Sequence, residues 1–489
     1  MPILPLYNQS LEAAGAPGVY AIEVQTPVIV EGIPLGRIMY AGQFAWGPAN
    51  EIYEPLDTSD YLRTYEPPGS PRNSPGYYGL MRRRRLSLAV VRVLGSGAVA
   101  ATTTQMGTGG SWTATAKYLG ALGNSISIVQ APASNGVAGN KKFTAILSDP
   151  ITGTTEELIA DNVAPPNGTA VTFDVSGLVL LTSFTVATAL TAFPADGTFA
   201  LTTGANGAAI GSSDYATALD ALIQGATDGA VLLTDDPGNT IRSAVNDEVY
   251  DRTVLAAGRF LGIVQGATGA AFSAHQSDVA NYRSRWVKYS GGWVYVRDDG
   301  GTPQRTPWST YIASALINLL PQQSDAWRAA QVGETYYSTV DEIDTSGYNP
   351  GLVQALSTQL GISLPLRLPS GRHVGIHDRN TSLDVRYRYT VTSRISRFIA
   401  LSLEEGLADW VNAPNVADEQ NDLVTATRNF MSQQVSGGRT ISFSISTSGN
   451  TPTTAALGQF FVDISAQTPA PMEQIGLRIA AGPTVEIIQ

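Results

Sequence analysis

The sequence contains no cysteine and only three histidines among its 489 residues. The lack of cysteine excludes disulfides, thiolate metal ligands and cysteine nucleophiles together. No apolar run approaches the roughly 20 residues of a membrane-spanning helix, and the first ten residues lack the basic and apolar regions of a signal peptide. The sequence therefore predicts no thiolate chemistry and no insertion into a membrane.

Charged residues are also scarce. They make up 15% of the chain, and the net charge is −11. A nucleic-acid partner is not expected, because phosphate binding depends on a basic field. Hydrophobic residues reach 43%, which is enough to build buried cores. A chain of this length exceeds one core, so we expect about three domains.

Short apolar segments broken by glycine and proline predict the order of elements in the first part of the chain. Residues 1–18 have no periodicity and contain three prolines, which predicts an extended arm. Residues 37–42 and 86–94 predict buried strands, with a helix between them that begins at the capping residue Asp57. Residues 108–204 are poor in charge and rich in threonine, alanine and glycine, which predicts an inserted β-domain.

Alternating helix and strand patterns return after the insertion. A helix is expected with Asp214 as its cap, and strands are expected at 259–264, 286–289 and 293–296. The fold class is therefore mixed α/β and multidomain: a central mixed sheet flanked by helices, an inserted β-sandwich-like or β-barrel-like domain, and extended terminal arms. The predicted division is an arm at 1–18, an α/β domain at 19–107 and 205–371 around the insertion at 108–204, a C-terminal α/β domain at 372–482, and a final strand at 483–489.

Two amphipathic helices in the last third should pack together. The apolar residues expected at their contact are Ile395, Phe398, Ile399, Leu423 and Phe430. Residues 440–445 then alternate like a strand, and the final strand pattern at 485–488 has no later partner in the sequence. It must pair backwards or with another molecule.

Several groups of residues resemble reactive sites but have a simpler structural interpretation. His373 and His377 stand beside Asp378, yet the segment alternates like a strand, and a zinc site needs three or four converging ligands. Asp235-Asp236 and Asp298-Asp299 border proline or glycine, which is typical of turns. We predict no metal, no cofactor and no catalytic residue, and therefore no enzyme.

Two further segments have an open role. The glycine-rich stretch 106–110 lacks the Lys-Ser/Thr of a nucleotide-binding loop and is interpreted as a linker into the inserted domain. The run Arg82 to Arg85 could suggest nucleic acid or membrane, but in an acidic chain an acidic neighbour or a solvated loop is favoured. A local contact within an assembly is our hypothesis for it.

The order of motifs resembles that of the contractile tail sheath family. Ala16 to Glu23 (APGVYAIE) is similar to the family's Pro-Gly-Val-Tyr opening, and Ile38 to Pro48 to its apolar strand and Gly-Pro turn. Lys117 to Ile128 resembles the Tyr-Pro-Gly-Ala-Trp-Gly-Asn motif, with leucine in place of proline and tryptophan. The C-terminal third resembles the family again, at 372–378, 387–406, 412–415 and 469–475.

The resemblance implies a structural subunit that forms stacked hexameric rings around a tail tube and contracts to drive the tube through a host envelope for genome ejection. It implies self-association by exchange of terminal strands, together with tail tube, baseplate and neck or terminator proteins as partners, in a virion tail assembled in the host cytoplasm. The residues expected in the exchanged strands are Leu4, Leu6, Val19, Tyr20, Ile22, Val485, Ile487 and Ile488.

Three alternatives stay open at this point. The chain could be another self-assembling particle component, such as a tail tube, capsid or surface-layer protein, or the sheath of a phage-derived bacteriocin. It could also be a β-rich glycan hydrolase, which would need paired carboxylates in a cleft.

Overall fold

The computed structural model describes residues 5–6, 21–22, 36–66, 87–149, 153–166, 168–226, 229–235, 238–256, 259–297, 301–326 and 340–471. The chain divides into two compact units. The main unit comprises Pro34–Arg397 with Ala470–Gln489, and the C-terminal unit comprises Phe398–Pro469 with Met1–Ile33.

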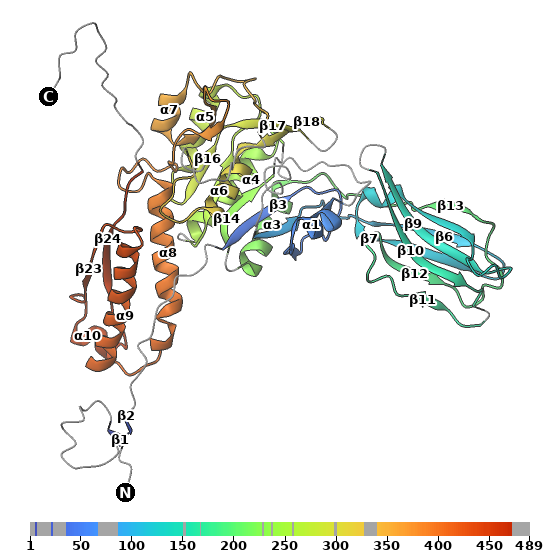
Figure 1. Cartoon of the computed structure of the whole chain (residues 1–489), viewed down its shortest axis with the longest axis horizontal. Helices are drawn as coiled ribbons and strands as arrows, with labels where there is room; N and C mark the ends of the chain where they lie inside the picture. Colours follow the sequence, from blue (N-terminus) through green and yellow to red (C-terminus); the bar gives the residue numbers. More distant parts are fainter. Residues whose placement is uncertain are drawn as a thin grey trace. The chain divides into compact units, whose positions relative to one another are not determined.

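A seven-stranded sheet forms the centre of the main unit, with the order β20-β16-β15-β14-β3-β5-β4 (Figure 1). All neighbouring strands are parallel except β4 and β5, so the sheet is mixed, as expected. The strands are β3 (Arg37–Gly42), β4 (Ile52–Tyr53), β5 (Leu88–Arg92), β14 (Gly229–Thr234), β15 (Leu261–Gln265), β16 (Val287–Ser290) and β20 (Ile362–Ser363).

Helices cover both faces of this sheet, because successive strand residues point to opposite sides. Ile38 and Tyr40 belong to the core shared with α1 and α6, whereas Met39 and Ala41 belong to the core shared with α3, α4 and α5. The helices are α1 (Thr58–Tyr65), α3 (Ser212–Gly225), α4 (Arg242–Leu255), α5 (Phe272–Val279) followed by η3 (Ala280–Tyr282), α6 (Trp308–Asn318) and α7 (Gln354–Leu360).

Two predicted helix caps differ in outcome. Asp57 is the N-cap of α1 and accepts a hydrogen bond from the Asp60 amide at 2.8 Å, which confirms that prediction. The cap predicted at Asp214 is wrong, because α3 begins one turn earlier and its N-cap is Gly211. Asp214 instead accepts a hydrogen bond from the Gly211 amide at 2.9 Å, the reciprocal contact of a capping box.

The inserted domain is a sandwich of two four-stranded sheets, β11-β12-β7-β6 and β10-β9-β8-β13. Trp112, Phe143 and Phe184 lie between the sheets, and the rings of Phe143 and Phe184 are 4.8 Å apart. The elements are β6 (Ala100–Met106), β7 (Ser111–Leu119), η2 (Ala121–Ser125), β8 (Ile126–Pro132), β9 (Lys141–Asp149), β10 (Gly153–Val163), β11 (Val171–Phe173), β12 (Leu181–Val186) and β13 (Gly197–Ala200).

The glycine-rich stretch 106–110 is a hairpin turn within the sandwich. The Gly107 amide donates to the Gly110 carbonyl at 2.8 Å, and β6 before it pairs with β7 after it. The interpretation of this stretch as a linker into the domain is therefore wrong, since β6 already belongs to the sandwich. The chain enters and leaves the domain at adjacent points, where Val99 and Ala205 form an antiparallel bridge.

Two small sheets complete the described part of the main unit, with the orders β18-β17-β19 and β21-β22. Their strands are β17 (Trp293–Arg297), β18 (Pro303–Pro307), β19 (Glu342–Ile343), β21 (Pro365–Arg367) and β22 (His373–Gly375). His373 lies in β22, as the strand interpretation required. His377 is buried and contacts the Ile362 carbonyl through Nε2 at 2.8 Å.

Helix α8 (Thr390–Gly406) begins in the main unit and ends in the C-terminal unit. The C-terminal unit continues with η5 (Ala408–Trp410), α9 (Ala417–Ser436), β23 (Ser442–Ser446), α10 (Pro452–Ala456) and β24 (Asp463–Gln467). Among the described residues, no helix is both long and apolar enough to cross a bilayer.

Candidate assembly site

The structure places two of the eight residues expected in exchanged strands. Leu6 lies in β1 (Pro5–Leu6) and Ile22 in β2 (Ala21–Ile22), and these two strands pair in parallel within one chain. The other six residues lie outside the described residues, as does Arg82 to Arg85. Strand exchange between subunits therefore stays a prediction. The six are Leu4, Val19, Tyr20, Val485, Ile487 and Ile488.

Strands β23 and β24 form a two-stranded antiparallel sheet in the C-terminal unit. Ser442 lies opposite Gln467, and Ser446 lies opposite Asp463. Within the described ranges, neither strand has a second neighbour, so the hairpin has two open edges. An open edge presents unpaired N–H and C=O groups that can accept a further strand. A lone two-stranded hairpin is also only marginally stable, so an added strand would stabilise it.

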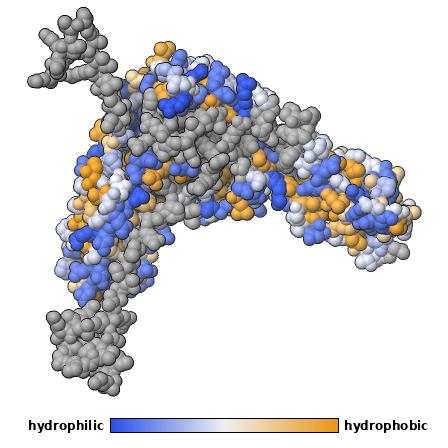
Figure 2. Space-filling model, viewed as in Figure 1, coloured by the Kyte–Doolittle hydropathy of each residue, from blue (hydrophilic) through white to orange (hydrophobic). Residues whose placement is uncertain are grey.

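Apolar side chains surround this hairpin. Phe443 and Ile445 of β23 are half-buried, while the serines that alternate with them are exposed. Ile441, Leu457 and Phe461 nearby in the sequence are exposed large apolar residues. In the view of Figure 2, hydrophilic and hydrophobic residues are interspersed over the described surface. Exposed apolar residues beside an open strand edge are typical of a surface that another chain covers.

Four of the five residues expected at the contact of the two amphipathic helices are buried. Ile395, Phe398, Ile399 and Phe430 are each at most 8% exposed, whereas Leu423 is half-buried. The rings of Phe398 and Phe430 stack at 6.3 Å with an angle of 28° between them. The ring of Phe398 also receives the Arg439 guanidinium at 4.8 Å. This apolar contact joins α8 to α9 within the C-terminal unit.

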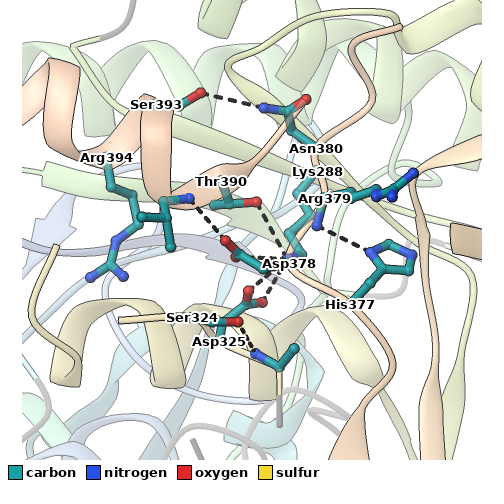
Figure 3. A network of polar contacts seen from close by, with 12 residues as sticks. Lys288, Ser324, Asp325, His377, Asp378, Arg379, Asn380, Thr390, Ser393 and Arg394 are labelled. Atoms are coloured by element: carbon teal, nitrogen blue, oxygen red, sulfur yellow. Dashed lines mark hydrogen bonds and ion pairs between the residues drawn. The ribbon is translucent and has the colours of Figure 1, made fainter. Parts of the chain in front are cut away.

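A cluster of buried charges holds the first turn of α8 in the main unit (Figure 3). The ammonium of Lys288, on β16, lies 2.7 Å from Asp325 and 3.9 Å from Asp378. Asp378 accepts a hydrogen bond from the Val391 amide at 3.0 Å, which satisfies a donor at the start of the helix. All three charged side chains are 2% exposed.

Arg394 extends this cluster to the end of α6. Its guanidinium donates to the carbonyls of Leu316 at 2.5 Å, Leu319 at 2.6 Å and Gln323 at 3.0 Å. The last carbonyls of α6 lack partners within the helix, so a cation that donates to them is favoured there. The cluster therefore ties α8 to both β16 and α6.

The two carboxyl groups of the cluster have opposite pKa shifts. Burial alone would raise the pKa of Asp325, but the Lys288 ammonium and a hydrogen bond from Asp378 lower it below its usual value. Burial and the neighbouring Asp325 raise the pKa of Asp378 well above its usual value. Asp378 is therefore protonated at neutral pH and donates to the ionised Asp325. Burial lowers the pKa of Arg394 to about 10, and the two acids oppose that shift.

Sequence reasoning missed this cluster almost completely. Asp378 was considered only as a neighbour of the two histidines, and Lys288 lay unnoticed inside a predicted strand. A lysine within the apolar run Trp286 to Tyr289 was the one available signal, because a buried lysine requires an acidic partner. In the described part of the chain, no group of three histidine or acidic side chains converges as a metal site.

Comparison with known proteins gives one kind of match. No protein-family model matches the sequence, and no curated protein matches it. Among solved structures, the sheath tail protein of Desulfitobacterium hafniense is 14% identical, with a TM-score of 0.61 over 88% of this chain and 94% of its own. The sheath tail protein of Listeria innocua is 14% identical, with a TM-score of 0.58 over 90% and 96%. The contracted helical sheath of the anti-feeding prophage is 14% identical, with a TM-score of 0.57 over 95% and 99%.

These matches define a class by fold. The chain has the fold of contractile sheath proteins, both of the sheath tail proteins and of a contractile injection particle, over most of its length. The structural neighbours confirm the resemblance and the mixed α/β fold class that the sequence predicted.

Proposed function

We propose that this chain is a structural, non-enzymatic subunit of a contractile tail sheath. The observation that carries the proposal is the extent of the fold match, which includes 88% to 95% of this chain and 94% to 99% of three sheath chains. A match of that extent includes the inserted domain and the C-terminal unit as well as the central sheet. The open hairpin of β23 and β24 supplies a plausible physical means of self-association.

Subunits assemble into stacked hexameric rings around a tail tube, and exchanged terminal strands connect neighbours. The arms at 1–18 and 483–489 supply the strands, and the edges of the β23–β24 hairpin receive them. Each backbone hydrogen bond contributes about 1 kcal/mol net, so two added strands of several bonds each tether a subunit by several kcal/mol. Such tethers hold subunits together while their bodies move.

Contraction requires a second set of contacts with two stable arrangements. The extended arrangement is trapped above a contracted one of lower free energy, and the small gain of each subunit adds over many rings. The tube is thereby driven through the host envelope, with the baseplate at one end and neck or terminator proteins at the other. This mechanism needs no catalytic residue.

Electron microscopy of the purified protein tests the proposal directly. A sheath subunit forms short, wide tubes with a cogwheel cross-section. Narrow smooth tubes or closed shells would instead identify a tail tube or capsid protein. Images of the intact particle then separate a phage tail, which carries a DNA-filled head, from a headless bacteriocin.

Deletion of the arms tests the tether. Removal of residues 1–15, or of residues 483–489, leaves a soluble folded subunit that cannot polymerise, because the hairpin edges then receive no strand. Circular dichroism and thermal melting beside the full-length chain check that the subunit is folded. Normal tubes from either truncated chain would contradict the strand-exchange tether and leave the sheath fold unaffected.

A further inference from the structure

Arginine and aromatic side chains form a stacked surface immediately before α8 in the main unit. The Arg285 guanidinium lies 4.4 Å from the Trp286 ring and 4.8 Å from the Tyr387 ring. Arg386 lies 5.3 Å from the Tyr387 ring, and Arg388 lies 5.0 Å from the Tyr389 ring. We call this set the arginine surface: Arg285, Trp286, Arg386, Tyr387, Arg388 and Tyr389.

The charges of the arginine surface are poorly neutralised. Arg386 pairs with Asp384 at 2.7 Å, but in the described part of the chain Arg285 and Arg388 form no ion pair. The side chain of Arg386 is 74% exposed. A guanidinium stacked on a ring is held in one orientation, and its fork of donors matches a carboxylate. The surface is therefore suited to an acidic partner.

Exposed apolar residues lie in the same loop. Leu383 is 67% exposed and Val385 is 68% exposed, on either side of Asp384. Arginine, tyrosine and tryptophan are enriched where proteins bind one another, and apolar residues commonly pack between them. A partner protein with both carboxylates and apolar side chains fits this loop better than a small anion does.

The same chain carries a surface of that description at the other end of α8. No lysine or arginine occurs between Arg397 and Arg428, while this stretch contains six acidic residues. Glu405, Asp409, Asp418 and Asp422 are exposed, as are the apolar side chains of Val411 and Val416. We call these six residues the acidic end.

The position of Glu405 gives the acidic end a physical need for a cation. Glu405 lies in the last turn of α8, and that turn contains no basic residue. A carboxylate there faces the negative end of the helix dipole, which costs about 0.3–1 kcal/mol. A guanidinium from another molecule would remove that cost.

The two surfaces cannot meet within one chain. Arg388 precedes the first residue of α8, Thr390, whereas Glu405 is next to its last residue. The 15 residues from Thr390 to Glu405 span about 22 Å along a continuous helix. Neutralisation therefore requires a second molecule.

We propose that the arginine surface of one subunit docks on the acidic end of a second copy of this chain. The two surfaces differ, so the contact is heterologous and propagates from subunit to subunit, as in a ring or helical filament. The inference rests on the proposed sheath function and deepens it, because it adds a charge-dependent contact to the strand tether. The net charge of −11 disfavours nucleic acid as the occupant of the arginine surface.

Charge reversal with exchange tests this contact in the full-length chain. The first variant is Arg285→Glu with Arg386→Glu, and the second is Glu405→Arg with Asp409→Arg. Each variant alone opposes like charges, so the protein concentration needed for tube formation should rise at least about tenfold. An equimolar mixture pairs each altered surface with its complement and should restore tubes. Pelleting and electron microscopy measure both results.

The matched control is Lys142→Glu with Arg372→Glu, which changes the net charge by the same amount away from both surfaces. Thermal melting checks the fold of every variant, and Arg386→Glu alone replaces the first variant if that one is unfolded. Normal assembly of either reversed variant, or a mixture that stays unassembled, would overturn the contact while wild-type tubes keep the sheath function intact. A wild-type chain that forms no tubes would instead refute the sheath function, and the contact with it.

Discussion

Lys288, Asp325 and Asp378 show how the protein distributes charge in its interior. Two positive groups, Lys288 and Arg394, surround two carboxyl groups, of which only Asp325 is ionised. Asp325 is within 2.8 Å of the Lys288 ammonium, so its charge neutralises the lysine directly. Asp378 acts instead as a neutral donor and as an acceptor for the first turn of α8. The two carboxyl groups therefore have different worth to the fold.

Replacement of each acid by its amide separates these roles. Asp325→Asn leaves two buried cations without a counter-charge and should lower the free energy of unfolding at pH 7 by about 3–5 kcal/mol. Asp378→Asn keeps an oxygen for the Val391 amide and a donor for Asp325, so it should change that free energy by less than about 1 kcal/mol. Chemical denaturation measures both. Equal losses from the two variants would contradict the assigned protonation states.

The pH dependence of stability gives a second test of Asp378. An unfolded aspartate titrates near 3.8, whereas the folded pKa of Asp378 is raised well above that value by burial and by Asp325. Between these two pKa values the folded state holds a proton that the unfolded state has released, so the contribution of Asp378 to stability falls as pH rises. Asp325 contributes in the opposite direction, because its folded pKa is lowered, and its contribution is lost as pH falls.

Asp378→Asn should remove the first of these effects. Relative to this variant, the wild type should lose stability as the pH is raised from 4 towards 7. Unfolding curves of the two proteins at several pH values in that interval measure the difference. A wild type that gains stability relative to Asp378→Asn over this interval would show that Asp378 is ionised in the folded state.

At the scale of elements, local patterns predicted strands and helices well where a single physical rule decides. Tyr40 and its neighbours alternate between two helix layers, and Asp57 caps a helix as its side chain allows. The cap at Asp214 was wrong because glycine also serves as an N-cap, and a carboxylate at the third helical position has the same composition signal. The 106–110 turn was wrong because glycine marks a bend without indicating which strands it joins.

The candidate site was predicted only in part, because it depends on contacts between distant segments. Phe398 and Phe430 were expected to pack, and their rings do stack in the C-terminal unit. The charge cluster joins residues up to 106 positions apart in the sequence, such as Lys288 and Arg394, and no local pattern encodes that. The stacking of Arg285 on Tyr387 was likewise invisible in the sequence, since about 100 residues separate them.

The helix contact in the C-terminal unit should be separable from the main unit. Phe430→Ala removes a ring that is 1% exposed and should cost about 3–5 kcal/mol in that unit. Hydrogen exchange should then accelerate in α9 and leave β14, which lies in the main unit, unchanged. Val424→Ala is the matched control on the same helix, because Val424 is only half-buried. Faster exchange in β14 as well would mean that the two units unfold together.

At the scale of the whole molecule, the inserted sandwich interrupts the central sheet without taking part in it. β5 precedes the insertion and β14 follows it, yet both flank β3 directly. The two connections meet at the bridge between Val99 and Ala205, where each amide donates to the other carbonyl at 2.9 and 3.0 Å. The central sheet therefore keeps its strand order if the sandwich is removed.

Excision of the sandwich should leave a folded sheath subunit. Replacement of residues 99–205 by two glycines spans the bridge without strain, since its two ends are already adjacent. Two contacts would be lost: Trp46, which is fully buried against the sandwich and donates to the Val179 carbonyl at 3.2 Å, and the bond from Arg92 to the Leu119 carbonyl at 2.8 Å. Trp46→Ser in the excised chain prevents exposure of the indole.

The excised chain should retain cooperative unfolding and still form tubes, because the main sheet, α8 and the hairpin that receives the arms are all unchanged. Trp46→Ser in the full-length chain is the control and should lose about 3–5 kcal/mol, because there it opens a cavity against the sandwich. Circular dichroism and electron microscopy distinguish the outcomes. An excised chain that folds but forms no tubes would place the sandwich in the contacts between subunits, whereas an unfolded one would make it part of the folding core of the main unit.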